Sequence, residues 1–83
     1  TDGVQVSLNK NLALGDSGSV TTGATTVNGN GITITKAAGA PAGITNVSLT
    51  NTGLDNGGNK ISNVAAGVNG KDAVNVNQLD AVN

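Results

Sequence analysis

The sequence predicts a mostly β chain that ends on a short α-helix and needs copies of itself to fold. Three observations predict this class. Apolar and polar residues alternate over short stretches bounded by Gly and Asn, a pattern typical of half-buried strands. The large apolar residues are only Val, Leu and Ile, because the 83 residues contain no aromatic residue and no Met. A helix signal appears only after Gly70, beyond which the chain has neither Gly nor Pro.

The first two strands are expected in "VQVSLNKNLAL". Val4, Val6 and Leu8 alternate with polar residues, and Leu12 and Leu14 do the same after the polar stretch "NKN". The polar stretch is short enough for a turn, so the sequence predicts a hairpin here.

The strongest hairpin signal is the doubled Asn-Gly in "TTVNGNGITIT". Thr25 and Val27 precede it, and Ile32 and Ile34 follow it at the same alternation. Asn and Gly tolerate the positive φ angles that tight hairpin turns require. We therefore expect two paired strands on either side of this turn.

Three further stretches connect the hairpin to the helix. "KAAGAPAG", which holds the only proline, predicts a crossover connection rather than a strand. "ITNVSLT" resumes the alternation, with Thr45, Val47 and Leu49 on one face. "NTGLDNGGNKISNVAAGVNG" is expected to be compact and irregular, with one short strand at "KISNV".

The C-terminal helix is expected to begin after Asp72, whose carboxylate can accept hydrogen bonds from the amides of the first turn. Val76 and Leu79 lie three apart, as the a and d positions of a coiled coil do. In that register Asn83 is either a buried polar residue that fixes the oligomeric state or a terminal residue outside the packing. A helix of about 11 residues is marginal in water by itself, so it needs partner helices.

Oligomerisation is also predicted by what the composition lacks. Without Cys there is no disulfide and no thiolate metal site, and without His the commonest metal ligand and general base is missing. Small chains with weak cores usually need disulfides, a metal or association. A net charge of −1 makes nucleic acid a poor partner, and no apolar run approaches the roughly 20 residues of a membrane span.

The polar residues predict no catalytic, cofactor or metal site, and hence no enzyme. Paired carboxylates are not expected, because the acidic residues are scattered and read best as turn or cap residues. No His is present to activate a Ser or Thr, and "GNG" lacks the Lys and helix of a phosphate-binding loop. The acidic residues are Asp2, Asp16, Asp55, Asp72 and Asp80.

"GLDNGGNKISNVAAGVNGKDAVNVNQL", residues 53–79, closely resembles the neck of trimeric autotransporter adhesins, which are fibrous surface proteins of Gram-negative bacteria. "DAVNVNQL" resembles the most diagnostic motif of that neck. Upstream, residues 4–35 are similar in rhythm to the β-rich heads of these adhesins, and "NGNGITIT" resembles the head type called a GIN domain. The related Trp-ring head is disfavoured because Trp is absent, and a β-roll head has only the single partial echo "NLALGDSG".

The resemblance implies a homotrimer whose head, residues 1–52, is an interleaved β-prism. The neck and the start of a coiled-coil stalk would occupy residues 53–83. The implied function is structural and adhesive: a surface segment that projects a binding face, with a host extracellular-matrix or cell-surface ligand as a further partner. A part of the chain outside this sequence would anchor it in the outer membrane, with no membrane insertion by this segment. A trimeric phage tail-fibre segment and a pure spacer without ligand stay open as alternatives.

The resemblance also implies where the three chains meet. In the neck of the family each chain passes across to its neighbours, and small residues permit close backbone crossings near the threefold axis. Leu54, Ile61 and Val64 are then expected to fill the shared interior, and Val76 and Leu79 to form the seam of the stalk. The glycines that suit the crossing are Gly53, Gly57, Gly58, Gly67 and Gly70.

Overall fold

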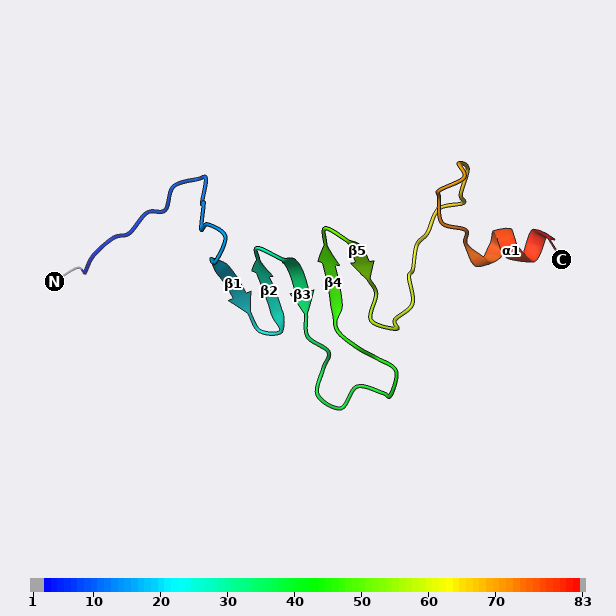
Figure 1. Cartoon of the computed structure of the whole chain (residues 1–83), viewed down its shortest axis with the longest axis horizontal. Helices are drawn as coiled ribbons and strands as arrows, with labels where there is room; N and C mark the ends of the chain where they lie inside the picture. The colour runs from blue at the N-terminus through cyan, green and yellow to red at the C-terminus, as the bar shows by residue number, and fades with distance from the viewer. Residues whose placement is uncertain (1–2, 83) are drawn as a thin grey trace.

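Short strands joined by tight turns form the central part of the molecule. The computed structural model describes residues 3–82, in which five strands are followed by one helix. The chain is drawn out along one axis, with overall extents of 71 × 34 × 27 Å (Figure 1). The elements are β1 (Ser19–Thr22), β2 (Thr25–Asn28), β3 (Gly31–Ile34), β4 (Val47–Thr50), β5 (Gly53–Asp55) and α1 (Val76–Val82).

The strands form one open antiparallel sheet in the order β1-β2-β3-β4-β5, so each strand pairs with its neighbour in the sequence. The expected hairpin is confirmed as β2 and β3, with Asn28 opposite Gly31 and residues 29–30 in the turn. Gly31 has φ +128°, and a Cβ there would collide with the carbonyl oxygen of Leu49. Glycine is therefore required where β3 leaves the turn.

Two strands were not expected from the sequence. β1 and β5 each contain a single large apolar residue, Val20 and Leu54, so their alternation is too short to indicate a strand. Both are edge strands, and each is ordered by pairing with one inner neighbour. Their existence follows from β2 and β4 rather than from their own residues.

The connection from β3 to β4 is a loop, as expected, but it is not a crossover. β3 and β4 are adjacent and antiparallel, with Ile32 opposite Leu49 and Ile34 opposite Val47, so the loop only reverses the chain. The Lys36 amide donates to Oδ1 of Asn46 at 2.9 Å, which closes the base of the loop.

The predicted hairpin in residues 4–14 is wrong. Residues 3–18 contain no strand, and Figure 1 shows this segment as an arm leading away from β1. Val4 is 90% exposed. A half-buried strand needs a partner strand, and within residues 3–82 no strand pairs with the arm. Only Leu12 and Leu14, near its end, lie beside Val20 and Val27 of the sheet. The predicted strand at "KISNV" is wrong as well: residues 60–64 are irregular, and Asn63 has φ 62°.

The helix begins later than expected. The sequence predicted Asp72 as its cap, but α1 starts at Val76 and Asn75 is the capping residue, because Oδ1 of Asn75 accepts the Gln78 amide at 3.0 Å. Asp72 instead accepts hydrogen bonds from residues before it in the chain. Asn83, expected at the next seam position, lies outside the described residues.

Candidate functional site

One face of the sheet is apolar. Val20, Val27, Ile32, Leu49 and Leu54 are successive cross-strand partners, so they form a row across all five strands. Side chains two residues apart in a strand share a face, which places a second apolar pair beside this row. The apolar face consists of Val20, Val27, Ile32, Ile34, Val47, Leu49 and Leu54.

No strand or helix in residues 3–82 packs over the apolar face. The exposed fractions of six of its seven side chains range from 38% at Ile32 to 61% at Leu54, and Val47 is half-buried. Among residues 3–82 no apolar side chain is buried, and Gly57 is the one buried residue. A sheet becomes stable when its apolar face packs against a second layer. Because residues 3–82 supply no such layer, the apolar face is a candidate interaction surface.

The other face of the sheet is polar. Thr21, Thr26, Thr33, Ser48 and Asp55 are cross-strand partners in a second row, and the hydroxyl oxygens of Thr21 and Thr26 lie 3.3 Å apart. The two faces therefore differ in chemistry, as the strand alternation dictates, although Thr22 and Thr25 lie on the same face as Val20 and Val27. The polar face consists of Ser19, Thr21, Thr26, Asn28, Thr33, Ser48, Thr50 and Asp55.

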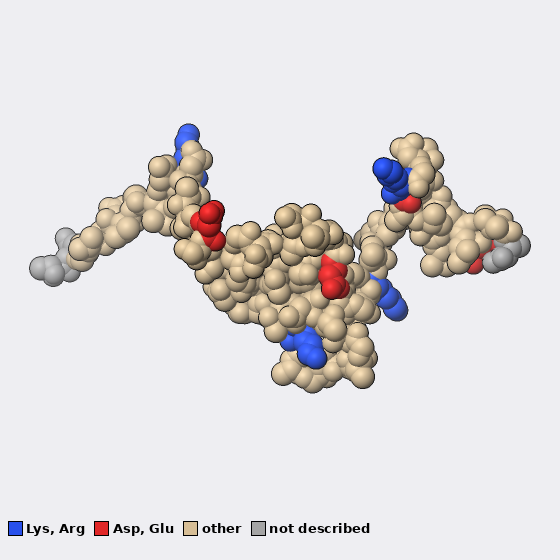
Figure 2. Space-filling model, viewed as in Figure 1, with Lys and Arg blue, Asp and Glu red and all other residues tan. Residues whose placement is uncertain are grey.

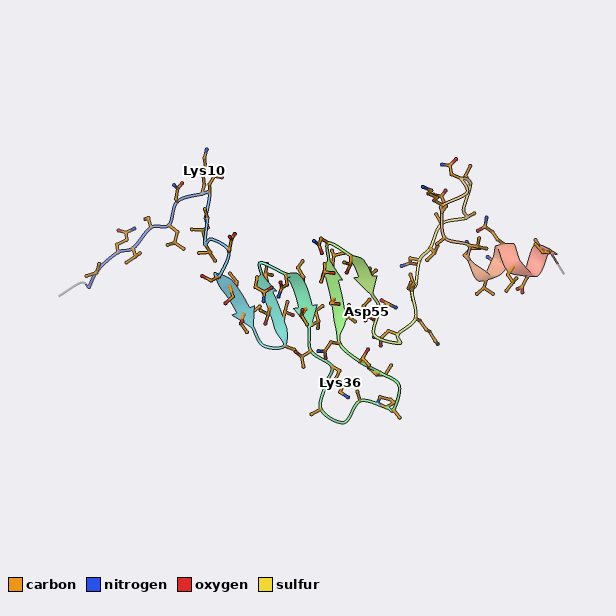
Figure 3. All side chains as sticks on the ribbon, in the orientation of Figure 1. Lys10, Lys36 and Asp55 are labelled. Carbon is orange, nitrogen blue, oxygen red and sulfur yellow. The ribbon has the colours of Figure 1, made fainter. Side chains whose placement is uncertain are left out.

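Charged side chains are scattered rather than gathered at one place. Figure 2 shows Lys and Asp residues spread along the visible face with neutral surface over most of it, apart from one blue and one red patch side by side near the C-terminal end. In Figure 3 Lys10 lies on the N-terminal arm, Lys36 at the loop after β3 and Asp55 at the end of β5. Within residues 3–82 no three metal-ligating side chains come close enough to hold an ion.

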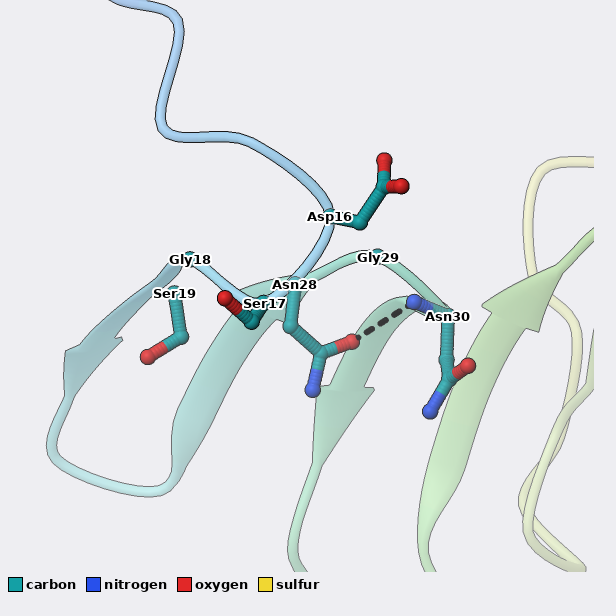
Figure 4. A pocket seen from close by; sticks show the side chains of 7 residues that line it. All are labelled: Asp16, Ser17, Gly18, Ser19, Asn28, Gly29 and Asn30. Carbon is teal, nitrogen blue, oxygen red and sulfur yellow. Dashed lines mark hydrogen bonds between the residues drawn. The ribbon is translucent and has the colours of Figure 1, made fainter.

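A polar hollow of about 540 Å³ lies at the end of the sheet where β1 begins and β2 turns into β3 (Figure 4). The side chain of Asn28 points along this turn and accepts the Asn30 amide at 2.9 Å. Asp16 is the one ionisable residue of the lining, so the hollow contains no acid and base pair. Its walls are Asp16, Ser17, Gly18, Ser19, Asn28, Gly29 and Asn30.

A second organised region surrounds the start of α1. The Gln78 amide donates to Oδ1 of Asn75 at 3.0 Å, and the Asn75 amide donates back to Oε1 of Gln78 at 3.1 Å. These reciprocal bonds form a capping box, which satisfies amides that a helix start leaves without partners.

The same two side chains hold the preceding loop. The Gly67 amide donates to Oε1 of Gln78 at 2.8 Å, and Nε2 of Gln78 donates to the Gly67 carbonyl at 2.9 Å. Nδ2 of Asn75 donates to the Val64 carbonyl at 3.0 Å. We call this set of bonds the neck lock: the side chains of Asn75 and Gln78 with the backbone of Val64 and Gly67.

Glycine is required in the neck lock for steric reasons. A Cβ on Gly67 would lie 2.6 Å from the carbonyl oxygen of Ala73 and 3.3 Å from Cβ of Asp72. The φ angle of Gly67 is not in the left-handed region, so the close approach of the two backbones, and not backbone conformation, excludes a side chain.

Asp72 stabilises a turn just before the helix. Its Oδ2 accepts the Asn69 amide at 2.9 Å and the Val68 amide at 3.0 Å. These two donors hold the pKa of the Asp72 carboxyl below its ordinary value, because they stabilise the ionised form. The turn brings residues 67–69 back toward the helix start.

Three of the predicted interface residues, Ile61, Val64 and Val76, line one hollow of about 400 Å³ within the chain, whereas Leu54 and Leu79 are not part of its lining. Leu54 lies in the apolar face of the sheet, whereas Ile61 lies in the irregular segment beyond it. Val76 and Leu79 are exposed on α1, with Leu79 at 59%, and Val64 is half-buried. Their meeting in a trimer stays a prediction.

Sequence reasoning missed two groups of residues. The spacing Asn75-x-x-Gln78 is a capping-box signal that could have located the helix start. The other group is the part of the apolar face on the edge strand β1, namely Val20, because the alternation in β1 is too short to indicate a strand.

No helix in residues 3–82 has both the length and the apolar character needed to cross a membrane.

Comparisons with known proteins place the chain. The family model described as the coiled stalk of trimeric autotransporter adhesins matches residues 60–83. Over 80 residues the chain is 48% identical to the trimeric autotransporter adhesin AtaA of Acinetobacter sp. (strain Tol 5). That alignment covers 96% of this chain and 2% of the adhesin, so the chain spans a small fraction of the length of its relative.

Proposed function

This chain belongs to the trimeric autotransporter adhesin family, and we propose that it serves as a structural segment of a surface fibre, folded as a homotrimer. The observation that carries this proposal is the uncovered apolar face of the sheet. Three copies with their apolar faces turned toward a common axis would bury those side chains and leave the polar faces in water. The result is a three-sided β-prism of the GIN type, the head expected from the sequence.

The proposed division is a head over residues 1–52 followed by the neck and stalk over residues 53–83. β5 begins the neck and pairs with β4, so the neck continues directly from the head sheet. Leu54, Ile61 and Val64 would pack between chains. Val76 and Leu79 would form the seam of the stalk, which the match over residues 60–83 supports.

The role of such a segment is mechanical and not enzymatic. It keeps three chains in register between a wide head and a narrow stalk, outside the cell, with the membrane anchor in another part of the protein. Any contact with a host matrix or cell-surface ligand would use the polar face, which the trimer displays in three copies so that weak contacts add up. Without such a ligand the segment is a spacer within the same fibre.

The test is the solution mass of the chain. The 83 residues are joined at the C-terminus to a trimeric coiled coil through a cleavable linker, assembled, and then cleaved. Light scattering at high protein concentration should report a threefold mass after cleavage. A single-chain mass together with a fully retained sheet would contradict the proposal, because one chain would then be folded without partners.

A further inference from the structure

The start of the stalk helix is defined by polar contacts within one chain. α1 has seven residues in the described chain and contains Val and Asn, which are weak helix formers. A helix this short is only marginally stable by itself, so the intrinsic helix propensity of its residues does not determine its first residue. Asp72 offers a competing cap four positions before Val76. In the structure the helix begins at the later position, Val76.

The neck lock makes this selection. Oε1 of Gln78 accepts two amides, those of Gly67 and Asn75, while its Nε2 donates to the Gly67 carbonyl. Asn75 uses Oδ1 as the helix cap and Nδ2 to hold Val64. Each side-chain oxygen and nitrogen of Asn75 and Gln78 takes part in at least one hydrogen bond. Of the three bonds to the backbone of Val64 and Gly67, two are made by the side-chain amide of Gln78. Extending the helix upstream would break all of these bonds.

The competing cap is also occupied. Oδ2 of Asp72 accepts the amides of both Val68 and Asn69, so the carboxylate is held toward residues that precede it in the chain. Both features favour a helix that begins at Val76.

We propose that Asn75 and Gln78 are positioning residues that fix the first residue of the stalk helix and thereby the direction in which its seam leaves the neck. Successive helical residues are rotated by about 100°, so a start displaced by one residue would turn Val76 and Leu79 away from their partners. The inference rests on the proposed trimeric stalk. Each chain sets its own helix phase, and the three chains then need only to associate.

The experiment measures how strongly the chain prefers one helical phase of a fused coiled coil, and not its stability alone. Two fusions to a trimeric coiled coil are compared, one continuing Val76 and Leu79 as a and d positions and one offset by a single inserted alanine. The gap between their melting temperatures is measured for the parent, for Gln78→Met and for Asn77→Met. Met at position 78 keeps length and helix propensity but removes the amide, and Asn77 is an exposed neighbour outside the lock.

For the parent and for Asn77→Met, we expect the in-phase fusion to melt at a higher temperature than the offset fusion. The difference between the two melting temperatures should be the same for both proteins. In Gln78→Met the gap should fall to roughly half or less, because the helix start can then adjust to the coil. The Gly67 amide should also lose its protection from hydrogen exchange. An unchanged gap in Gln78→Met, with both fusions lowered equally, would overturn the positioning role while leaving the trimer intact. A parent without any gap would overturn the positioning role and the proposed seam together.

Discussion

The sheet and the neck lock are held in contrasting ways. In the sheet the backbone is paired strand to strand, yet the apolar face, with Ile32 at its centre, remains open to solvent. In the neck lock the contacts are polar and lie within the chain, and both Asn75 and Gln78 are half-buried. The contrast teaches that the sheet leaves an apolar face which the proposed trimer would cover, whereas the bonds of the lock are complete within one chain. Changes in the two regions should therefore have different consequences.

The largest effect is expected on the apolar face. Ile32→Asp would place three carboxylates in the proposed interior, where unpaired charges are very costly, so we expect a loss of about 4 kcal/mol or more per chain and failure to form trimers. Thr33→Asp is the matched control, because Thr33 is adjacent in β3 but belongs to the polar face. Thermal unfolding and light scattering measure both. Equal losses for the two variants would contradict the assignment of the faces.

The second effect concerns the seam. Leu79→Asp should weaken trimerisation by about 2 kcal/mol or more per chain, since it removes an apolar contact and brings three like charges near one axis. Asn77→Asp adds the same charge to the same helix away from the seam and should have little effect. Melting temperatures at one protein concentration give the comparison. If both variants had the same melting temperature as the parent, the seam would have been assigned to the wrong residues.

A smaller effect separates two glycines that lie between β5 and α1. Gly67→Ala should cost about 1 to 2 kcal/mol, because the added Cβ would force Gly67 away from Ala73 and strain the hydrogen bonds to Gln78. A Cβ on Gly70 would meet no atom within 4 Å, and Gly70 has no left-handed φ. The stability of the Gly70→Ala variant should therefore stay within about 0.5 kcal/mol of the parent. Chemical denaturation measures both variants. Equal stability would mean that the close approach at Gly67 is unimportant.

The smallest effect is a pH dependence. The amides of Asn69 and Val68 lower the pKa of Asp72 in the folded chain, so its contribution to stability is present above the unfolded pKa of about 4 and is lost as the pH falls through the folded pKa. Asp72→Asn removes this titration. We expect the melting temperatures of parent and variant to converge below about pH 4. If the melting temperatures of parent and variant differed by the same amount above and below about pH 4, the carboxylate charge would not stabilise the turn.

The sequence located structure well where the signals were local. The β2–β3 hairpin follows from Asn-Gly turn chemistry between alternating residues, and it was predicted at the correct position. β1 and β5 escaped prediction because an edge strand depends on its neighbour more than on its own residues. The alternation at Val4, Val6 and Leu8 indicates a strand but does not say which chain would pair with it. The arm in the single chain is accordingly unpaired.

The helix start illustrates a second limit. Asp72 and Asn75 are both acceptable caps by residue type, and the sequence offers no simple choice between them. The choice depends on a contact between residues eleven positions apart, Gln78 and Gly67. That contact is a property of the folded chain, although the Asn75-x-x-Gln78 spacing gave a partial signal.

The central claim is that the sheet is stable only when three chains share their apolar faces. The most direct test is to follow the β-sheet circular dichroism signal and the solution mass together, for residues 1–70 cut free of a trimerising extension, over a dilution series. The claim predicts that the β-sheet signal falls in step with the threefold mass as the protein is diluted. A cooperative, fully folded sheet at single-chain mass would contradict it.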